Sequence, residues 1–494
     1  MLKIHVTIHV TVDVSLLVTK LKYLVDKYRM YILCVNNCVG ARRVDLYWGH
    51  HGGQWGACGP EARFVYECLA SRAARNEHGS YDVKGLATSL RVSQKLASDA
   101  VVELVAVGAI VRTDTKTGRK GRPAIRIEIA PLLLDQIEEM DNPYGVHSDI
   151  LKRLFSEAGI LASVSGAQPS KTKIEGKCMP DGKAAPSGAR GRLSASNRVL
   201  LGSLLINADR FGVVSGIGQL ELERLTGFDE ASLKHRLRRL MDLGFIRSLV
   251  PGLSSSIFNS GKVSSTYFLN LNHPSFELHA VYSVMVHLVP QGAPKVKSHI
   301  DHLKWDIRAG ATDATSGDFD TPAAFLDFLN GTKGRALLPV LQIVLYRYAS
   351  YLLSSHWSAL KLDAAIEDDS LREDIRNDFR ESKAGIEWDV VVNHFYRLAI
   401  SIAKVFRSRF SQAARIDSAN AGFSILPVAQ DLGYDVITLL VWPAQPEQGA
   451  FVVLEDIGEG SVRLWPCVCE SELRLQNRYD FGLLTPPKGL RAGL

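Results

Sequence analysis

Cysteine and histidine residues gather near the N-terminus, and together these residue types could hold a metal ion. Thiolate and imidazole groups are the ligands of tetrahedral zinc sites. Structural zinc sites are typically built from closely spaced ligand pairs, whereas the Cys-x3-Cys spacing here is loose and no Cys-x2-Cys pair follows it. We therefore predict no metal site and interpret these residues as unrelated buried or surface side chains. They are Cys34, Cys38, His50, His51 and Cys58.

Carboxylates cluster between Asp363 and Lys383, which is the residue type that a divalent-metal nuclease needs. The same segment has apolar residues at helical spacing and arginines between the acids. This pattern is typical of an amphipathic helix whose solvent face is covered by ion pairs. We favour the amphipathic helix over a nuclease site. The carboxylates are Glu367, Asp368, Asp369, Glu373 and Asp374.

His394 and Arg397 have the His-x-x-Arg spacing that tyrosine recombinases use, and Tyr434 lies downstream as a notional nucleophile. The surrounding residues do not resemble that family. Two glycine-containing stretches, 216–218 and 331–334, lack the third glycine of a dinucleotide-binding turn and the spacing of a phosphate loop. We predict no catalytic residue and no cofactor, and we lean against an enzyme.

The composition is that of a globular protein with a mild basic excess. The chain has 494 residues, of which 46% are hydrophobic and 22% charged, and its formal net charge is +6. This length leaves room for roughly three domains. The charge is compatible with nucleic acid without establishing it, so the distribution of the cations must decide.

Several features predict a bacterial cytoplasmic protein that is not in a membrane. The most apolar stretch, Arg335 to Leu353, is interrupted by Pro339, Gln342 and Arg347, so we expect a buried helix there. The N-terminus alternates apolar and polar residues and lacks the pattern of a secretory signal. Seven cysteines, an odd number in a long chain, fit a reducing compartment.

An internal repeat organises the first half of the chain. A shift of 136 positions, which aligns Gly108 with Gly244, brings one stretch into register without gaps. In each copy we expect a helix, a tight turn, an N-capping residue, a second helix that ends at the glycine, and a hairpin. The aligned pairs are Leu86 and Leu222, Val92 and Phe228, Ser93 and Asp229, Ala97 and Leu233, Val101 and Leu237, Leu104 and Leu240, Val107 and Leu243, and Ile110 and Ile246.

Two such units in tandem resemble the winged helix-turn-helix family of bacterial regulators. The resemblance covers about 59–131 and 193–272. It implies that the second helix of each unit, 93–107 or 229–243, enters the major groove and that the hairpin, or wing, touches the backbone or minor groove. The expected fold is α+β and mainly α, with two winged helix-turn-helix domains and a C-terminal domain of helices and an antiparallel sheet.

The resemblance divides the chain into six parts. A flexible stretch from about Ser163 to Arg192 separates the two copies, because it is rich in Gly, Ser and Lys and has almost no large apolar residue. The parts are an N-terminal extension (1–58), winged helix 1 (59–131), a helical connector with the flexible linker (132–192), winged helix 2 (193–275), a connector (276–334) and the C-terminal α+β domain (335–494).

The candidate DNA-binding residues are those left on the outer faces once the core positions are assigned. Arginine and lysine there suit phosphates and guanine edges. The second wing, Pro251 to Lys262, is rich in serine, so we expect it to be mobile or to contact little. The first copy contributes Gln94, Lys95 and Ser98 from its helix and Lys116, Arg119, Lys120 and Arg122 from its wing, and the second helix contributes Lys234, His235, Arg238 and Arg239.

We therefore expect a protein that binds double-stranded DNA, as a transcriptional regulator or a mobile-element protein. Three alternatives stay open: a plasmid or phage replication initiator, a DNA-processing enzyme with its active site in 335–494, and a protein-interaction scaffold. A homodimer also stays open, because tandem units can contact two half-sites without one.

Overall fold

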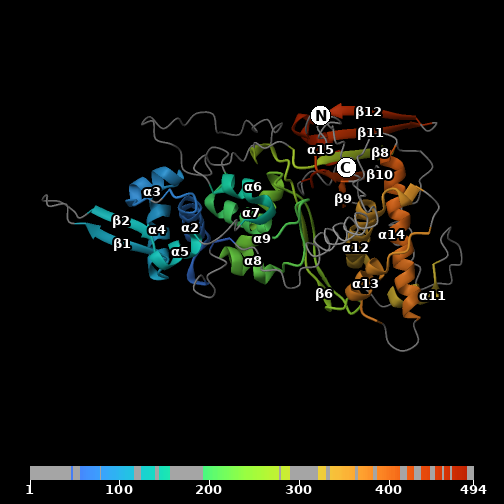
Figure 1. Cartoon of the computed structure of the whole chain (residues 1–494), viewed down its shortest axis with the longest axis horizontal. Helices are drawn as coiled ribbons and strands as arrows, with labels where there is room; N and C mark the ends of the chain where they lie inside the picture. The colour runs from blue at the N-terminus through green and yellow to red at the C-terminus, as the bar shows by residue number, and fades with distance from the viewer. Residues whose placement is uncertain are drawn as a thin grey trace, which may run out of the picture. The chain divides into compact units, whose positions relative to one another are not determined.

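Helices and strands follow one another in an α+β fold in which helix predominates (Figure 1). All the described residues belong to the larger of two units, Asp45–Leu494. Of the candidate zinc ligands, Cys58 is buried and the other four lie outside the described residues. The computed structural model describes residues 46–47, 56–77, 79–115, 124–138, 144–155, 193–276, 280–289, 321–329, 334–361, 365–381, 387–411, 420–427, 435–444, 451–458, 461–467 and 470–486.

The two copies of the repeat have the same order of elements. The bounds of the second and third helices in each copy, and the start of the strand that follows, differ by the 136 positions of the sequence alignment. The first copy has α2 (Pro60–Ala73), α3 (Val83–Leu90), α4 (Gln94–Ala106), β1 (Ile110–Thr115) and β2 (Ala124–Ile129). The second has α7 (Ala195–Ile206), β3 (Val213–Val214), α8 (Gln219–Thr226), α9 (Glu230–Asp242), β4 (Ile246–Val250) and β7 (Thr266–Leu269), with β5 (Leu253–Ser254) and β6 (Lys262–Val263) between the last two strands.

Strand pairing closes each copy. In the first copy β1 and β2 form an antiparallel hairpin, and Tyr81 forms a single bridge to Ile127 of β2. In the second copy the strand order is β3-β7-β4, with antiparallel neighbours. A third, short stretch of chain therefore joins the hairpin in both copies.

Local chemistry explains where the helices begin and end. Ser93 and Asp229 cap α4 and α9, since each side chain accepts a backbone N–H three residues further on, at 3.1 and 2.8 Å. Gly108 and Gly244 follow these helices with φ of +70° and +79°, a conformation that glycine adopts without steric cost.

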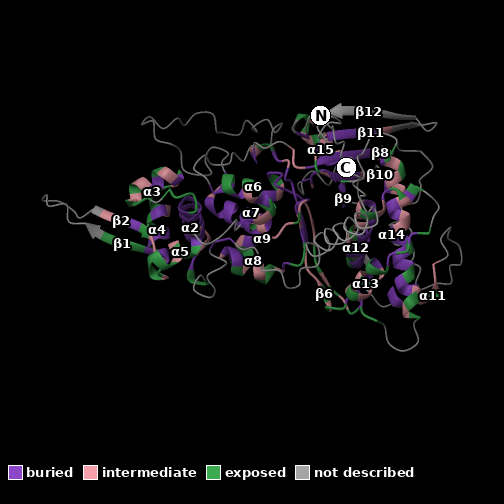
Figure 2. Cartoon of the chain, viewed as in Figure 1, coloured by how far each residue is buried: buried purple, intermediate pink, exposed green. Residues whose placement is uncertain are grey.

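The two copies share one core. The helices α2 and α7 pack against each other, and every residue from Ala62 to Ala73 is buried (Figure 2). Arg63 of the first copy donates to the carbonyl of Arg224 in the second at 2.6 Å. The guanidinium of Arg198 lies 5.6 Å from the ring centre of Phe64.

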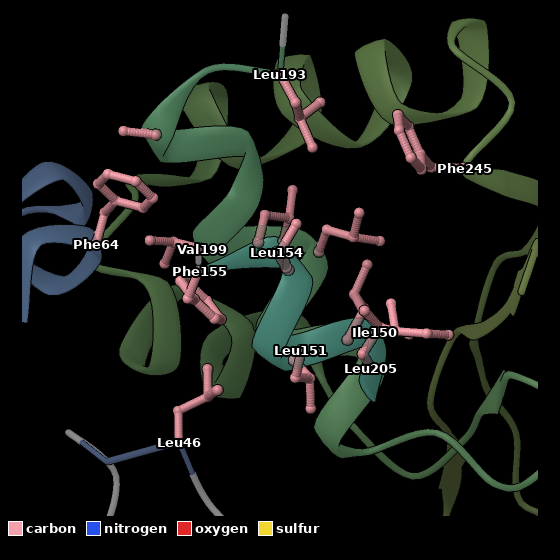
Figure 3. Close-up of a cluster of buried hydrophobic side chains, with 14 of the residues drawn as sticks. Leu46, Phe64, Ile150, Leu151, Leu154, Phe155, Leu193, Val199, Leu205 and Phe245 are labelled. Atoms are coloured by element: carbon pink, nitrogen blue, oxygen red, sulfur yellow. The ribbon is translucent and has the colours of Figure 1, made fainter. Parts of the chain in front are cut away.

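The connector between the copies contributes to this core. It contains α5 (Pro131–Glu138), which packs on α2, then η2 (Gly145–His147) and α6 (Ser148–Leu154), which pack on α7. Figure 3 shows Phe155 among the apolar side chains around α7. The predicted flexible linker, 163–192, lies outside the described residues.

A buried carboxyl group in α2 adds a pH dependence to this core. Glu67 is fully buried and accepts the backbone N–H of Tyr47 at 3.1 Å, and burial raises the pKa of Glu67 to about 8. The folded chain thus holds the proton more tightly than the unfolded chain. Its stability should therefore fall as the pH rises from about 4.5, the ordinary pKa, to about 8.

We expect Glu67→Gln to raise the free energy of unfolding by about 1–3 kcal/mol at pH 8, because glutamine removes the buried charge. Denaturant unfolding of both chains at pH 5 and pH 8 would measure the change. An equal effect of the substitution at both pH values would contradict the assignment.

The C-terminal part is a five-stranded sheet with helices packed on one face. Within the described residues the strand order is β12-β11-β8-β10-β9. The helices α11 and α13 pack on α14, and α12 packs on α14 and β9. The helices are α11 (Ala323–Leu329), α12 (Gly334–His356), η4 (Ala359–Lys361), α13 (Asp369–Asp378) and α14 (Trp388–Ser411), and the strands are β8 (Ser283–Val289), β9 (Gly422–Leu426), β10 (Asp435–Trp442), β11 (Phe451–Gly458) and β12 (Ser461–Cys467).

The sheet differs from the expected antiparallel sheet in its central strand. β8 lies in the segment interpreted as a connector (276–334) and runs parallel to β11, so the sheet is mixed and not purely antiparallel. Its alternate residues are buried in two cores: Val284 and Val286 pack with the repeats, and Met285 packs with the helices. A strand that is buried on both faces is mainly apolar along its whole length, and five of the seven residues of β8 are apolar.

The helix α12 contains a stretch, Ala336–His356, that by length and composition is long and apolar enough to cross a membrane. In the structure this helix packs against α14 and β9, and 61% of its most apolar 18-residue stretch is buried. Pro339 lies inside it, near its first turn.

A buried charge cluster joins the second copy to the end of the chain. Arg247 of β4 donates to both carboxylate oxygens of Glu470, at 2.9 and 2.6 Å. The same guanidinium donates to Asn270 at 2.7 Å and to Tyr282 at 3.3 Å. Glu470 begins the short helix η6 (Glu470–Glu472), which precedes α15 (Leu475–Asp480).

Candidate nucleic-acid interface

The helix α9 has one buried face and one basic, exposed face. Leu233, Leu237 and Leu240 are buried at spacings of four and three, so they form the inner stripe of an amphipathic helix. The opposite side chains all point to solvent. They include the four candidates that the sequence assigns to this helix, which are Lys234, His235, Arg238 and Arg239.

The two arginines of this face carry uncompensated charge. Lys234 pairs with Glu230 one turn earlier on the same helix. Within the described part of the chain, neither Arg238 nor Arg239 forms an ion pair. Their guanidinium groups are therefore available to an anionic partner, and no internal carboxylate has to be displaced first.

The corresponding face of α4 is chemically different, although Gln94, Lys95 and Ser98 are all exposed as expected. In the shared register Ser98 stands at the position of Lys234, and Val102 at that of Arg238. Glu103 replaces Arg239, and its carboxylate accepts the backbone N–H of Gly59 at 2.7 Å. The outer-face residues assigned from the sequence already differ in this way, because the first helix contributes one cation and the second contributes a lysine and two arginines.

The described strands β1 and β2 carry the first wing, whereas its four candidate cations, Lys116, Arg119, Lys120 and Arg122, lie outside the described residues. Arg112 of β1 and Arg126 of β2 are exposed, and Arg126 lies opposite Thr113 in the hairpin. These two arginines add charge to the strands that lead to the basic segment.

The second wing is anchored within the protein, which differs from the expectation of a mobile segment. Ile257 and Phe258 are buried in the core of the C-terminal helices. The ring of Phe258 stacks on Phe379 with 5.6 Å between the ring centres. The backbone N–H of Arg380 donates to the carbonyl of Ile257 at 2.7 Å, and that of Asn259 to the carbonyl of Asp378 at 3.0 Å.

The physical reason lies in the composition of this segment. Ile257 and Phe258 are two adjacent large apolar residues in a stretch of serine and glycine. Apolar surface of this size is stabilised by burial, and the C-terminal helices supply the site for it. That pair of residues was the signal in the sequence.

Of the residues considered for recombinase chemistry, the structure describes His394 and Arg397. His394 is buried against Phe325, with 4.3 Å between the ring centres, and burial lowers the pKa of His394 to about 4. Arg397 is exposed on α14. Tyr434 lies outside the described residues.

The carboxylates of 363–383 take part in local interactions. Glu367 and Asp369 both pair with Arg372, as expected for a helix with ion pairs on its surface. Asp368 caps α13 by accepting the backbone N–H of Leu371 at 3.0 Å. In the described ranges no three His, Cys, Asp or Glu side chains come together in a way that could hold a metal ion.

Comparison with known proteins identifies no relative of this chain. No protein-family model, no curated protein and no solved structure matches the chain. Only its own residues therefore bear on its function.

Proposed function

We propose that this chain binds double-stranded DNA and that the outer face of α9 is its principal contact surface. This proposal rests on two exposed arginines without an ion-pair partner among the described residues, Arg238 and Arg239. They lie on one face of a helix whose other face is buried. Arginine on such a surface supplies both phosphate contacts and the bidentate contact to guanine.

The order of elements supports an assignment of both copies as winged helix-turn-helix units. In each copy two helices joined by a short turn are followed by a hairpin. The second helix of a helix-turn-helix lies in the major groove, with its N-terminal residues next to base edges. In the second copy that helix is α9, and Lys234 and His235 lie in its first half.

The anchoring of the second wing supports this assignment of the contact surface to α9 in particular. With Ile257 and Phe258 buried, the tip of that wing is not available to DNA. The Arg247–Glu470 pair also joins β4, which follows α9, to the C-terminal part. A contact helix on a rigid support retains its geometry when it binds. We propose the role of transcriptional regulator or mobile-element protein for the whole chain.

The double substitution Arg238→Ala and Arg239→Ala tests the proposal. We expect roughly 100-fold weaker binding to duplex DNA, because each arginine contact contributes a large share of the affinity. Each lost phosphate contact should also make the slope of log affinity against log salt less steep by about 0.9. Fluorescence anisotropy over a salt series measures both quantities.

A charge-matched control separates this surface from general electrostatics. Arg397→Ala with Arg409→Ala removes the same charge from α14, and we expect it to leave affinity and salt slope nearly unchanged. Equal losses in the two double variants, or no loss in the α9 variant, would remove the basis for the proposal.

A further inference from the structure

Val102 on α4 is an apolar side chain that is largely exposed to solvent. It is 65% exposed, and Val105, one turn further on, is 38% exposed. In the register of the repeat Val102 stands at the position of Arg238. Both side chains are exposed, so the repeat presents this position to solvent in α4 as it does in α9.

The exposed residues of α4 that precede Val102 on this face are polar, and the two charged ones among them, Lys95 and Asp99, are of opposite sign. Gln94, Lys95 and Ser98 are exposed, and Asp99 balances the charge of Lys95. This face would therefore contribute little electrostatic free energy to the binding of DNA phosphates. Base edges fit it better, because glutamine pairs with adenine and small apolar groups contact the 5-methyl group of thymine.

The same copy carries its positive charge elsewhere. The segment between β1 and β2 contains four cations and no acid in the sequence Lys116 to Pro123. Most candidate cations of the first copy therefore lie outside α4 in the sequence. In the second copy they lie on α9 itself. A helix that does not have to bind phosphates can have a valine where its partner helix has an arginine, because an apolar side chain can still contact a base.

We propose that α4 reads an A·T-containing half-site, with Val102 against a thymine methyl group and Gln94 on an adenine edge in the major groove. This inference rests on the proposed DNA binding. The helices α4 and α9 then recognise different base pairs. The preferred duplex is therefore a composite site in which an A·T-rich half lies beside a guanine-containing half.

Removal of single methyl groups from DNA tests this contact. Duplexes selected from a random pool by the wild-type chain are resynthesised with deoxyuridine in place of each thymine in turn. At one position the wild-type chain should bind the deoxyuridine duplex about fourfold more weakly, the effect of one buried methyl-sized group. Val102→Ala should bind both duplexes equally, because the partner of the methyl group is gone.

Val111→Ala is the matched control, since Val111 is also an exposed valine, at 41%, and lies on β1. It should discriminate the two duplexes as the wild-type chain does. Equal binding of both duplexes by the wild-type chain overturns the thymine contact while DNA binding stands. Binding to no duplex overturns the proposed function itself. A self-association that Val102→Glu abolishes, with thymine discrimination absent, identifies the face as a protein contact and also overturns the inference.

Discussion

Glu470→Ala is expected to lower the free energy of unfolding by about 3–5 kcal/mol, because it leaves a charged guanidinium in a buried site without a carboxylate. The side chain of Arg247 is 0% exposed and that of Glu470 is 5% exposed. Burial by itself would lower the pKa of Arg247, but the charges and hydrogen bonds of Glu470 and Tyr282 together hold that pKa above its usual value. Arg247 stays charged when its partner is removed, because an arginine guanidinium is not deprotonated in proteins. Denaturant unfolding, followed by circular dichroism, measures the loss.

A second variant separates loss of the pair from loss of packing. In Arg247→Met with Glu470→Leu both charges are replaced by apolar groups of similar length, and such exchanges are often neutral or stabilising. We expect the double variant to recover most of the stability lost by Glu470→Ala. A double variant as unstable as the single one would show that the charges are not the source of the effect.

Phe258→Ala is expected to cost a similar amount, about 3–5 kcal/mol, because it removes a buried aromatic ring and leaves a cavity. The ring lies between the second wing and α13, and it belongs to the core of the C-terminal helices. The loss should be local as well as global. Residues 253–263 should become sensitive to limited proteolysis, which a time course read by mass spectrometry would detect.

Ser256→Ala provides the control, because Ser256 is exposed on the same segment. We expect it to change the free energy of unfolding by less than about 0.5 kcal/mol and to leave the proteolysis pattern unaltered. If Phe258→Ala behaved like Ser256→Ala, the segment would not be anchored through its ring.

These contacts join the second copy to the C-terminal part of the chain at separate points, η6 and the end of α13. Arg210 adds another, with its guanidinium 5.0 Å from the ring centre of Trp442 in β10. The second copy is therefore attached through an ion pair, an aromatic stack and a cation–π contact.

The sequence alone determined the features that depend on neighbours along the chain. The repeat with its shift of 136, the capping residues Ser93 and Asp229, and the exposed basic stripe of α9 all follow from helical periodicity and local hydrogen bonds. These interactions act within a few residues, so the order of residue types is enough to predict them.

Only the tertiary structure decided the features that depend on distant parts of the chain. Arg247 and Glu470 are 223 positions apart, and neither residue type predicts the other as its partner. The second wing looked polar and free, yet Phe258 is buried because α13 supplies an apolar site, and β8 became the central strand because its two faces meet two different cores. Burial is a property of the assembled surfaces, and a pattern of residues states only which side chains could be buried.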